Sequence, residues 1–301
     1  MRVLELYSGI GGVAAALGKT AEIAAAVDQS QPALSVYRHN FPSHPTVEKR
    51  VDCLDRDWLR RRHADLWWAS PPCQPFTVRG QRRGLDDPRA DTFKALLRHL
   101  ENVRPRSFAM ENVEGFRDSD GHDLLRRTLD HAGYSQVREH LLCPSDLGVA
   151  NRRPRFYLVA SRGELQSEFD VSCPHPRLPE ILEAQPDPSL WLDATIVRRY
   201  HQALHVVDED DSYAVTSCFT SAYGRSHVRS GSYLRTRDGG LRRFSPIEIL
   251  RLLGFPTEFT LPQELRRSNA WRLVGNSLSL TPVRRVLSSI GPELSFRRSA
   301  S

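Results

Sequence analysis

Three features are rare or absent in this 301-residue sequence, and each absence narrows the class of protein. The 5 cysteines are dispersed and form no CxxC pair, which argues against a disulfide framework and against a zinc site. No apolar run approaches the length of a membrane span, and the N-terminus lacks the layout of a signal peptide. We therefore expect a soluble, cytoplasmic protein with no bound metal and no membrane partner.

Lysine is also rare. Lys19, Lys49 and Lys94 are the only lysines among 42 basic residues, so arginine carries the net charge of +6. The planar fork of arginine suits phosphates and base edges, which permits a polyanionic partner. A GC-rich coding sequence would give the same composition, and the sequence leaves both explanations open.

The order of apolar and helical segments predicts an α/β fold. Short apolar strands alternate with helices, which is typical of a largely parallel sheet covered on both faces. The expected strands cover residues 2–7, 21–28, 65–69, 107–110, 138–142 and 155–160, and the expected helices cover residues 13–19, 32–40, 92–103 and 123–132.

The character of the chain changes after about residue 164. Prolines become frequent and the pattern is irregular through about residue 240, after which helical periodicity returns at 246–253 and 282–290. We therefore predict a cofactor-binding catalytic domain at 1–164, a small target-recognition domain at 165–267, and a segment at 268–301 that returns to the first domain.

A strand–glycine–helix unit, LELYSGIGGVAAAL, is the first candidate site. Its glycines at positions 9, 11 and 12 would let the backbone turn tightly against a ligand. Asp28 ends the next strand, 19 residues after Gly9, where a carboxylate can accept hydrogen bonds from a ribose. The pattern is shorter than GxGxxG and fits a nucleoside cofactor without pyrophosphate, although an ordinary glycine turn would look the same.

The second candidate is SPPCQPF, at residues 70–76, directly after the strand DLWWA. Two prolines would fix the backbone ahead of Cys73 and present its thiol as a nucleophile. A buried small hydrophobe is the alternative role for this cysteine. The other four cysteines lack such a setting, and we assign them structural roles.

Two further segments carry charged groups at the ends of strands. Glu111 follows the apolar strand of SFAMENV, where a carboxyl group can share a proton with a substrate nitrogen. Arg153 and Arg155 alternate in NRRPRF and would suit a phosphate or an anionic intermediate. A surface or capping glutamate and a solvated edge strand are the alternatives.

Taken in order, these motifs resemble the cytosine-5 methyltransferase family. The resemblance covers residues 2–160 and 243–290 and rests on GxGG, PPCQ, ENV, RxR and the GNS of residues 275–277. Within the family, LELYSGIGG, PPCQPFT, Asn151, LLGFP and CFT are similar to the branch that methylates an anticodon-loop cytosine of aspartate tRNA. The sequence departs from that branch at Val78, where arginine is usual, and after CFT, where no lysine follows.

The resemblance implies a Rossmann-like, class I S-adenosylmethionine-dependent fold and a covalent mechanism. Cys73 would add to carbon 6 of cytosine, Glu111 would support the ring at N3 and the amine, and Arg153 and Arg155 would position the base and its backbone. The cofactor, released as S-adenosylhomocysteine, would lie against Tyr7, Ile10, Gly11, Gly12, Asp28, Asp52, Cys53, Ser70 and Asn276.

The resemblance also implies a nucleic-acid substrate, with tRNA favoured over duplex DNA, and we expect a monomer. The residues expected to contact substrate are Gln74, Arg79, Arg82, Arg83, Cys218, Phe219 and Thr220. Residues 77–88 would form a lid and backbone clamp, or an ordinary solvated loop. A DNA cytosine-5 methyltransferase, stand-alone or paired with a restriction enzyme, is the second hypothesis. A non-catalytic nucleic-acid-binding module is the third, and the intact Cys73, Glu111 and Arg153 argue against it.

Overall fold

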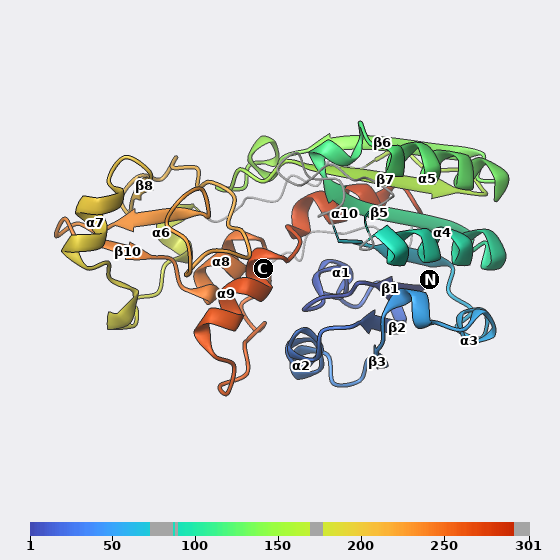
Figure 1. Ribbon diagram of the computed structural model, residues 1–301, viewed down its shortest axis with the longest axis horizontal. Coiled ribbons are helices and arrows are strands. Elements are labelled where there is room, and N and C mark those ends of the chain that lie inside the picture. The colour runs from blue at the N-terminus through green and yellow to red at the C-terminus, as the bar shows by residue number, and fades with distance from the viewer. Residues whose placement is uncertain (73–86, 88–89, 169–176, 292–301) are drawn as a thin grey trace. The chain divides into compact units, whose positions relative to one another are not determined.

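The computed structural model describes residues 1–72, 87, 90–168 and 177–291. The chain divides into two compact units (Figure 1). Unit 1 comprises Met1–Leu142, Pro154–Val171 and Val283–Ser301, and unit 2 comprises Cys143–Arg153 and Ser172–Pro282. These limits differ from the division expected at residues 164 and 267, because residues 143–153 and 268–282 both group with unit 2.

Unit 1 is built on a seven-stranded sheet in the order β3-β2-β1-β4-β5-β7-β6. Strands β1 to β5 run parallel, whereas β7 pairs antiparallel with both β5 and β6. This confirms the expected α/β class and all six expected strands. The strands are β1 (Arg2–Leu6), β2 (Glu22–Asp28), β3 (Thr46–Glu48), β4 (Leu66–Ala69), β5 (Ser107–Val113), β6 (Gln136–Leu142) and β7 (Arg155–Ser161).

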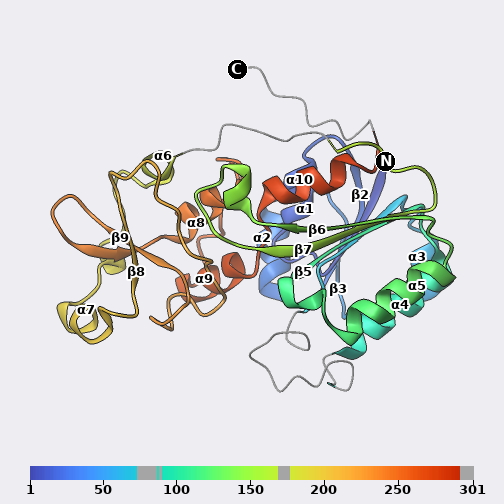
Figure 2. The ribbon, with the colours of Figure 1, turned by 90° about the horizontal axis from the view of Figure 1, so that it is seen from above.

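Helices cover both faces of this sheet, as Figure 2 shows for α4 and α5 on one face and α1 and α10 on the other. The central strands are buried on both sides, because a parallel sheet between two helical layers meets no water, and they are mostly apolar. The helices of this unit are α1 (Gly12–Leu17), α2 (Gln31–Asn40), α3 (Arg56–Arg60), α4 (Asp91–Val103) and α5 (Asp120–His131), and most of α10 (Leu280–Ser288) also belongs to it.

Unit 2 contains a three-stranded sheet in the order β10-β9-β8, where the sequence predicts only an irregular region. Its strands are β8 (His205–Asp208), β9 (Ser232–Arg235) and β10 (Leu241–Arg243). Each has only three or four residues, too few to give a periodic signal. The helices are α6 (Leu178–Ile181), α7 (Ala194–Tyr200), α8 (Pro246–Leu252) and α9 (Arg267–Gly275). In the described ranges 1–72, 90–168 and 177–291, no helix is long and apolar enough to cross a membrane.

A buried carboxyl group lies beneath the glycine loop of unit 1. Glu5, on β1, is only 1% exposed. Its carboxyl oxygens accept hydrogen bonds from the Val13 amide at 3.2 Å and from the Tyr37 hydroxyl at 3.0 Å, and that hydroxyl lies 3.3 Å from Nδ1 of His44. Burial raises the pKa of Glu5 to about 8. The carboxyl group therefore joins β1 to α1 and α2 and stays protonated at neutral pH.

This raised pKa makes stability depend on pH. The unfolded chain ionises Glu5 near pH 4.5, while the folded chain holds the proton up to about pH 8. The stabilisation from the neutral group is therefore complete below pH 4.5 and is lost as the pH rises towards 8. We expect Glu5→Gln to gain stability relative to the wild type over this window, by at most about 1.4 kcal/mol per pH unit. Urea unfolding of both proteins at several pH values measures the difference, and a pH-independent difference would contradict the assignment.

Candidate active site

The glycine loop between β1 and α1 holds three residues in the left-handed region of backbone space. Tyr7 has φ 56°, Gly9 has φ 55° and Gly11 has φ 96°. A Cβ atom on Gly11 would lie 2.8 Å from Cε2 of Phe41, so only glycine fits there. A Cβ atom on Gly9 would meet nothing within 4 Å, so the loop leaves open space at this position.

Asp28, at the end of β2, is hydrogen-bonded to the same loop. One carboxylate oxygen accepts from the Gly9 amide at 2.8 Å and the other accepts from the Ser30 amide at 2.7 Å. Burial raises the pKa of Asp28, while these amides act in the opposite direction. An ionised carboxylate has about four acceptor sites, so both oxygens can accept a further hydrogen bond. The open space at Gly9 and this acceptor capacity fit a nucleoside with free ribose hydroxyls.

We expect Asp28→Ala to weaken cofactor binding by about 1–3 kcal/mol, because it removes acceptors for the ribose and for the loop amides. Calorimetric titration with S-adenosylmethionine in the absence of nucleic acid measures this directly. Glu22→Ala on the exposed start of β2 is the matched control and should leave the dissociation constant unchanged. An unchanged constant for Asp28→Ala would remove this residue from the site.

The remaining expected cofactor residues of unit 1 occupy neighbouring strand ends. Ser70 follows β4, and its amide donates to the Leu6 carbonyl at 3.4 Å, which places it at the end of β1. Asp52 and Cys53 belong to a short 3₁₀ turn (Val51–Cys53), in which Asp52 forms two hydrogen bonds with Arg50. Ile10 and Gly12 are buried within the glycine loop and the start of α1.

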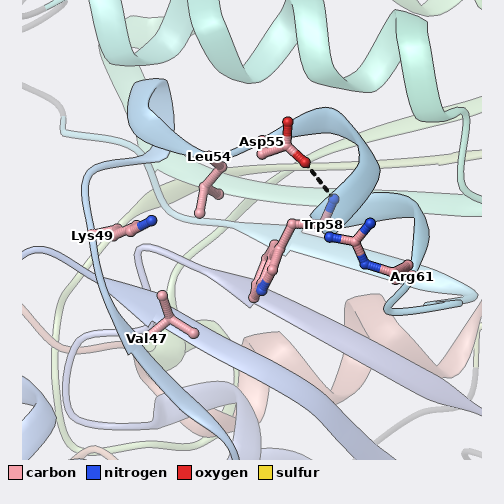
Figure 3. Close-up of a pocket in the computed structure, with 6 residues that line it drawn as sticks. All are labelled: Val47, Lys49, Leu54, Asp55, Trp58 and Arg61. Atoms are coloured by element: carbon pink, nitrogen blue, oxygen red, sulfur yellow. Dashed lines mark hydrogen bonds between the residues drawn. The ribbon is translucent and has the colours of Figure 1, made fainter.

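A pocket lies farther along the chain, between the end of β3 and α3 (Figure 3). The Asp55 carboxylate accepts a hydrogen bond from the Trp58 amide at 2.8 Å and so begins α3 beside it. The residues that line the pocket are Val47, Lys49, Leu54, Asp55, Trp58 and Arg61. None of the residues expected to bind the cofactor is among them.

The Pro-Pro and ENV segments lie next to each other because β4 and β5 are parallel neighbours. Ala69, at the end of β4, is paired with Met110 of β5. One residue beyond Glu111, the buried Asn112 donates a side-chain hydrogen bond to the Pro71 carbonyl at 3.4 Å. The ENV segment therefore fixes the backbone two residues before position 73.

Glu111 and Arg155 form an ion pair at this edge of the sheet. The Arg155 Nε atom lies 3.2 Å from Oε1 of Glu111, and their side chains are 17% and 12% exposed. Arg155 is opposite Val113 in the β5–β7 ladder, two residues from Glu111, so both side chains project from the same face. A partly buried carboxylate held by arginine stays oriented and can accept a hydrogen bond from a substrate amine.

Several of the residues expected from the sequence lie outside the described residues. They are the nucleophile Cys73 and the substrate contacts Gln74, Arg79, Arg82 and Arg83. Their roles stay predictions.

Arg153 has a different environment from the one expected of a substrate-binding residue. It belongs to unit 2 and is only 4% exposed. Its guanidinium donates to the Phe219 carbonyl at 2.9 Å, the Gly275 carbonyl at 3.2 Å and the Ser277 carbonyl at 2.6 Å. Arg153 therefore joins the CFT and GNS segments through their backbones, whereas Arg155 pairs with Glu111 in unit 1.

Phe219 also departs from its expected role in binding substrate. It is 1% exposed and packs edge-on against Tyr223 and Phe244 in the core of unit 2. The structure therefore places this side chain in the core, and its expected contact with substrate stays a prediction. Its neighbours Cys218 and Thr220 are half-buried.

The GNS segment packs directly against CFT. A Cβ atom on Gly275 would lie 2.3 Å from the carbonyl oxygen of Thr220, so the two backbones are in close contact. The next residue, Asn276, is exposed. It lies in unit 2, whereas the other expected cofactor residues lie in unit 1.

The roles of Glu5 and Asn112 were not predicted from the sequence. Glu5 accepts a hydrogen bond from the start of α1, and Asn112 donates one to the backbone at Pro71. A charged residue in the middle of the apolar strand RVLEL was the available signal for Glu5, since burying an acid requires hydrogen-bond partners. Asn112 gave no signal of its own, because its partner is a backbone carbonyl distant in the sequence.

The sheet order and the residues at its carboxyl edge define a class I methyltransferase fold. The model of the C-5 cytosine-specific DNA methylase family matches residues 1–228, and the chain belongs to this family of cytosine-5 methyltransferases. It is 31% identical to a tRNA (cytosine(38)-C(5))-methyltransferase of Spodoptera frugiperda, over 95% of this chain and 98% of that protein.

Two further relatives bear on the substrate. A DNA (cytosine-5)-methyltransferase of Dictyostelium discoideum is 28% identical, over 95% of this chain and 93% of that protein. The crystal structure of the S. pombe Dnmt2 methyltransferase superposes with a TM-score of 0.85 at 29% identity, covering 96% of this chain and 98% of that one. The family is thus shared by relatives named for tRNA and for DNA.

Proposed function

We propose that this enzyme methylates carbon 5 of a cytosine in a tRNA anticodon loop, with S-adenosylmethionine as methyl donor. The observation that supports the chemistry best is the arrangement at the carboxyl edge of the sheet. There the Pro-Pro segment before Cys73 is hydrogen-bonded to the ENV segment, and Glu111 is paired with Arg155. Every one of these groups lies in unit 1, together with the glycine loop.

The residues of this chain would hold the cofactor through the glycine loop and Asp28. Gly9 leaves room above the loop, and the Asp28 carboxylate can accept the ribose hydroxyls. S-adenosylmethionine, when bound, supplies an electrophilic methyl group. Ser70, Asp52 and Cys53 would complete the pocket in unit 1.

Cytosine needs activation because its carbon 5 is a weak nucleophile. The Cys73 thiolate would form a bond to carbon 6, which moves electron density to carbon 5. Glu111, oriented by Arg155, would accept a hydrogen bond from the exocyclic amine, and in its protonated form it would donate its proton to N3 and so neutralise the negative charge that develops there. After methylation, water would remove the proton of carbon 5, and the bond between Cys73 and carbon 6 would break.

The proposed tRNA substrate rests on the relatives named for this reaction, which match nearly the full length of the chain. A base in a loop also leaves its stack at lower cost than a base in a duplex. Unit 2 would recognise the target, with Cys218 and Thr220 beside the GNS segment. DNA methylation is the second candidate, because a relative named for DNA matches over a similar length.

The position of the methylated cytosine within the tRNA tests this proposal. Purified enzyme is incubated with labelled S-adenosylmethionine and a tRNA transcript, and the RNA is digested to nucleosides. We expect labelled 5-methylcytidine, and we expect its loss when one anticodon-loop cytosine is replaced by uridine. Label that survives replacement of every anticodon-loop cytosine would contradict the proposed target.

A further inference from the structure

An acidic turn in unit 2, residues 208–211, forms ion pairs with two arginines. Asp208 pairs with Arg235 at 3.2 Å, and Arg237 pairs with Glu209 at 3.4 Å and with Asp210 at 2.6 Å. Arg235 and Arg237 are therefore poorly suited to bind phosphate, although the sequence places them in an arginine-bearing stretch.

A different set of residues lies at the end of α7 and in the loop of residues 225–229, and we name it the His227 surface: Arg199, Tyr200, Arg225, His227 and Arg229. The Tyr200 and His227 rings lie 4.9 Å apart, which joins the end of α7 to the loop that contains residues 225–229. The Arg199 guanidinium lies 5.4 Å from the centre of the Tyr200 ring. All three arginines are exposed, and none forms an ion pair with a carboxylate in the part of the chain that the structure describes.

The charge around this surface is positive. Segments 194–207 and 212–234 contain no acidic residue. Burial and the positive charge of Arg243 lower the pKa of His227, so the imidazole adds little positive charge of its own and the three arginines supply the charge of this surface. An anion therefore meets an uncompensated positive field here.

The backbone of this surface is also strained. Arg229 has φ 51°, a conformation that costs a residue with a side chain about 1 kcal/mol more than glycine. Strained backbone tends to occur where a side chain must point in a required direction. The backbone strain at Arg229 is an observation independent of the charge pattern, and it lies in the same loop, residues 225–229.

We propose that the His227 surface binds the phosphate backbone of tRNA outside the methylated loop. This inference rests on the proposed function and specifies where the body of the substrate docks. Arginine forks bind phosphate oxygens in pairs, and the aromatic contact between Tyr200 and His227 holds α7 and the loop in one fixed spacing.

The test compares two triple variants that remove the same charge from unit 2. Arg199→Gln/Arg225→Gln/Arg229→Gln removes the His227 surface. Arg235→Gln/Arg237→Gln/Arg267→Gln removes three arginines that are paired with Asp208, Asp210 and Asp187. Binding of a tRNA transcript is measured by fluorescence anisotropy at several salt concentrations, and methyl transfer is measured at saturating tRNA.

For the first variant we expect tRNA affinity to fall about tenfold or more at 0.1 M salt, and the slope of log K against log salt to become shallower by about 2. The rate at saturating tRNA should stay close to that of the wild type. The control variant should keep the wild-type slope. Equal losses in both variants, or an unchanged slope in the first, would each overturn the proposal. If one of these results is found while the wild type still binds and methylates tRNA, the proposed function stands and only the proposal for the His227 surface is overturned.

Discussion

Replacement of Cys73 by alanine is expected to abolish methyl transfer while cofactor affinity stays within a few-fold of the wild type. The thiol is proposed to attack carbon 6 of the base and has no part in holding the cofactor. Loss of a covalent nucleophile lowers turnover by about 10⁴-fold or more in well-studied enzymes. Single-turnover transfer from labelled S-adenosylmethionine measures the rate, and calorimetry measures the affinity.

Cys173→Ala is the control for this experiment, since no part in catalysis or binding is expected of that cysteine, and it should retain activity. A substrate that carries 5-fluorocytosine adds an independent readout. The fluorine cannot leave as a proton does, so the adduct should persist as a denaturation-stable complex with the wild type and be absent with Cys73→Ala. Methylation by Cys73→Ala at a tenth of the normal rate would contradict the covalent mechanism.

Gly275→Ala is expected to destabilise unit 2 strongly. The new Cβ atom would lie 2.3 Å from the Thr220 carbonyl oxygen and 2.7 Å from the Ser221 amide nitrogen, and both are backbone atoms. Relief of the overlap must separate the GNS segment from the CFT segment, which also lengthens the Arg153 hydrogen bonds to Gly275 and Ser277. We expect a loss of about 3 kcal/mol of stability, and thermal unfolding measures it.

Gly163→Ala is the matched control, because its Cβ atom would make only ordinary contacts, the nearest at 3.8 Å to Arg106. That variant should unfold within about 1 kcal/mol of the wild type. If Gly275→Ala unfolded at the wild-type temperature and kept full activity, the close contact between the two segments would be wrong.

The sequence was informative wherever strands are buried on both faces. The run RVLEL is mostly apolar and is followed by Tyr7, and the run EIAAAVD has an apolar centre and ends at Asp28, so both strands and the polar residues at their ends could be predicted. The sequence also indicated that Glu111 and Arg155 lie at strand ends. It did not indicate the strand register that brings the two side chains together.

Contacts between segments distant in sequence could not be predicted. Arg153 and Arg155 look equivalent in the sequence, yet Arg153 is enclosed by backbone carbonyls that lie 66 to 124 residues away. Phe219 belongs to a motif that the sequence suggests is functional, but its side chain packs against Tyr223 and Phe244 in the core of unit 2. Such roles depend on tertiary packing, which local patterns do not encode.

The proposed action of this cytosine-5 methyltransferase on tRNA is tested by parallel methyl-transfer reactions on two substrates. Purified enzyme and labelled S-adenosylmethionine are incubated separately with a tRNA transcript and with duplex DNA at equal cytosine concentration. We expect rapid labelling of tRNA, with label in DNA at the level of a reaction without enzyme. Efficient labelling of the duplex with none in the tRNA would contradict the tRNA substrate.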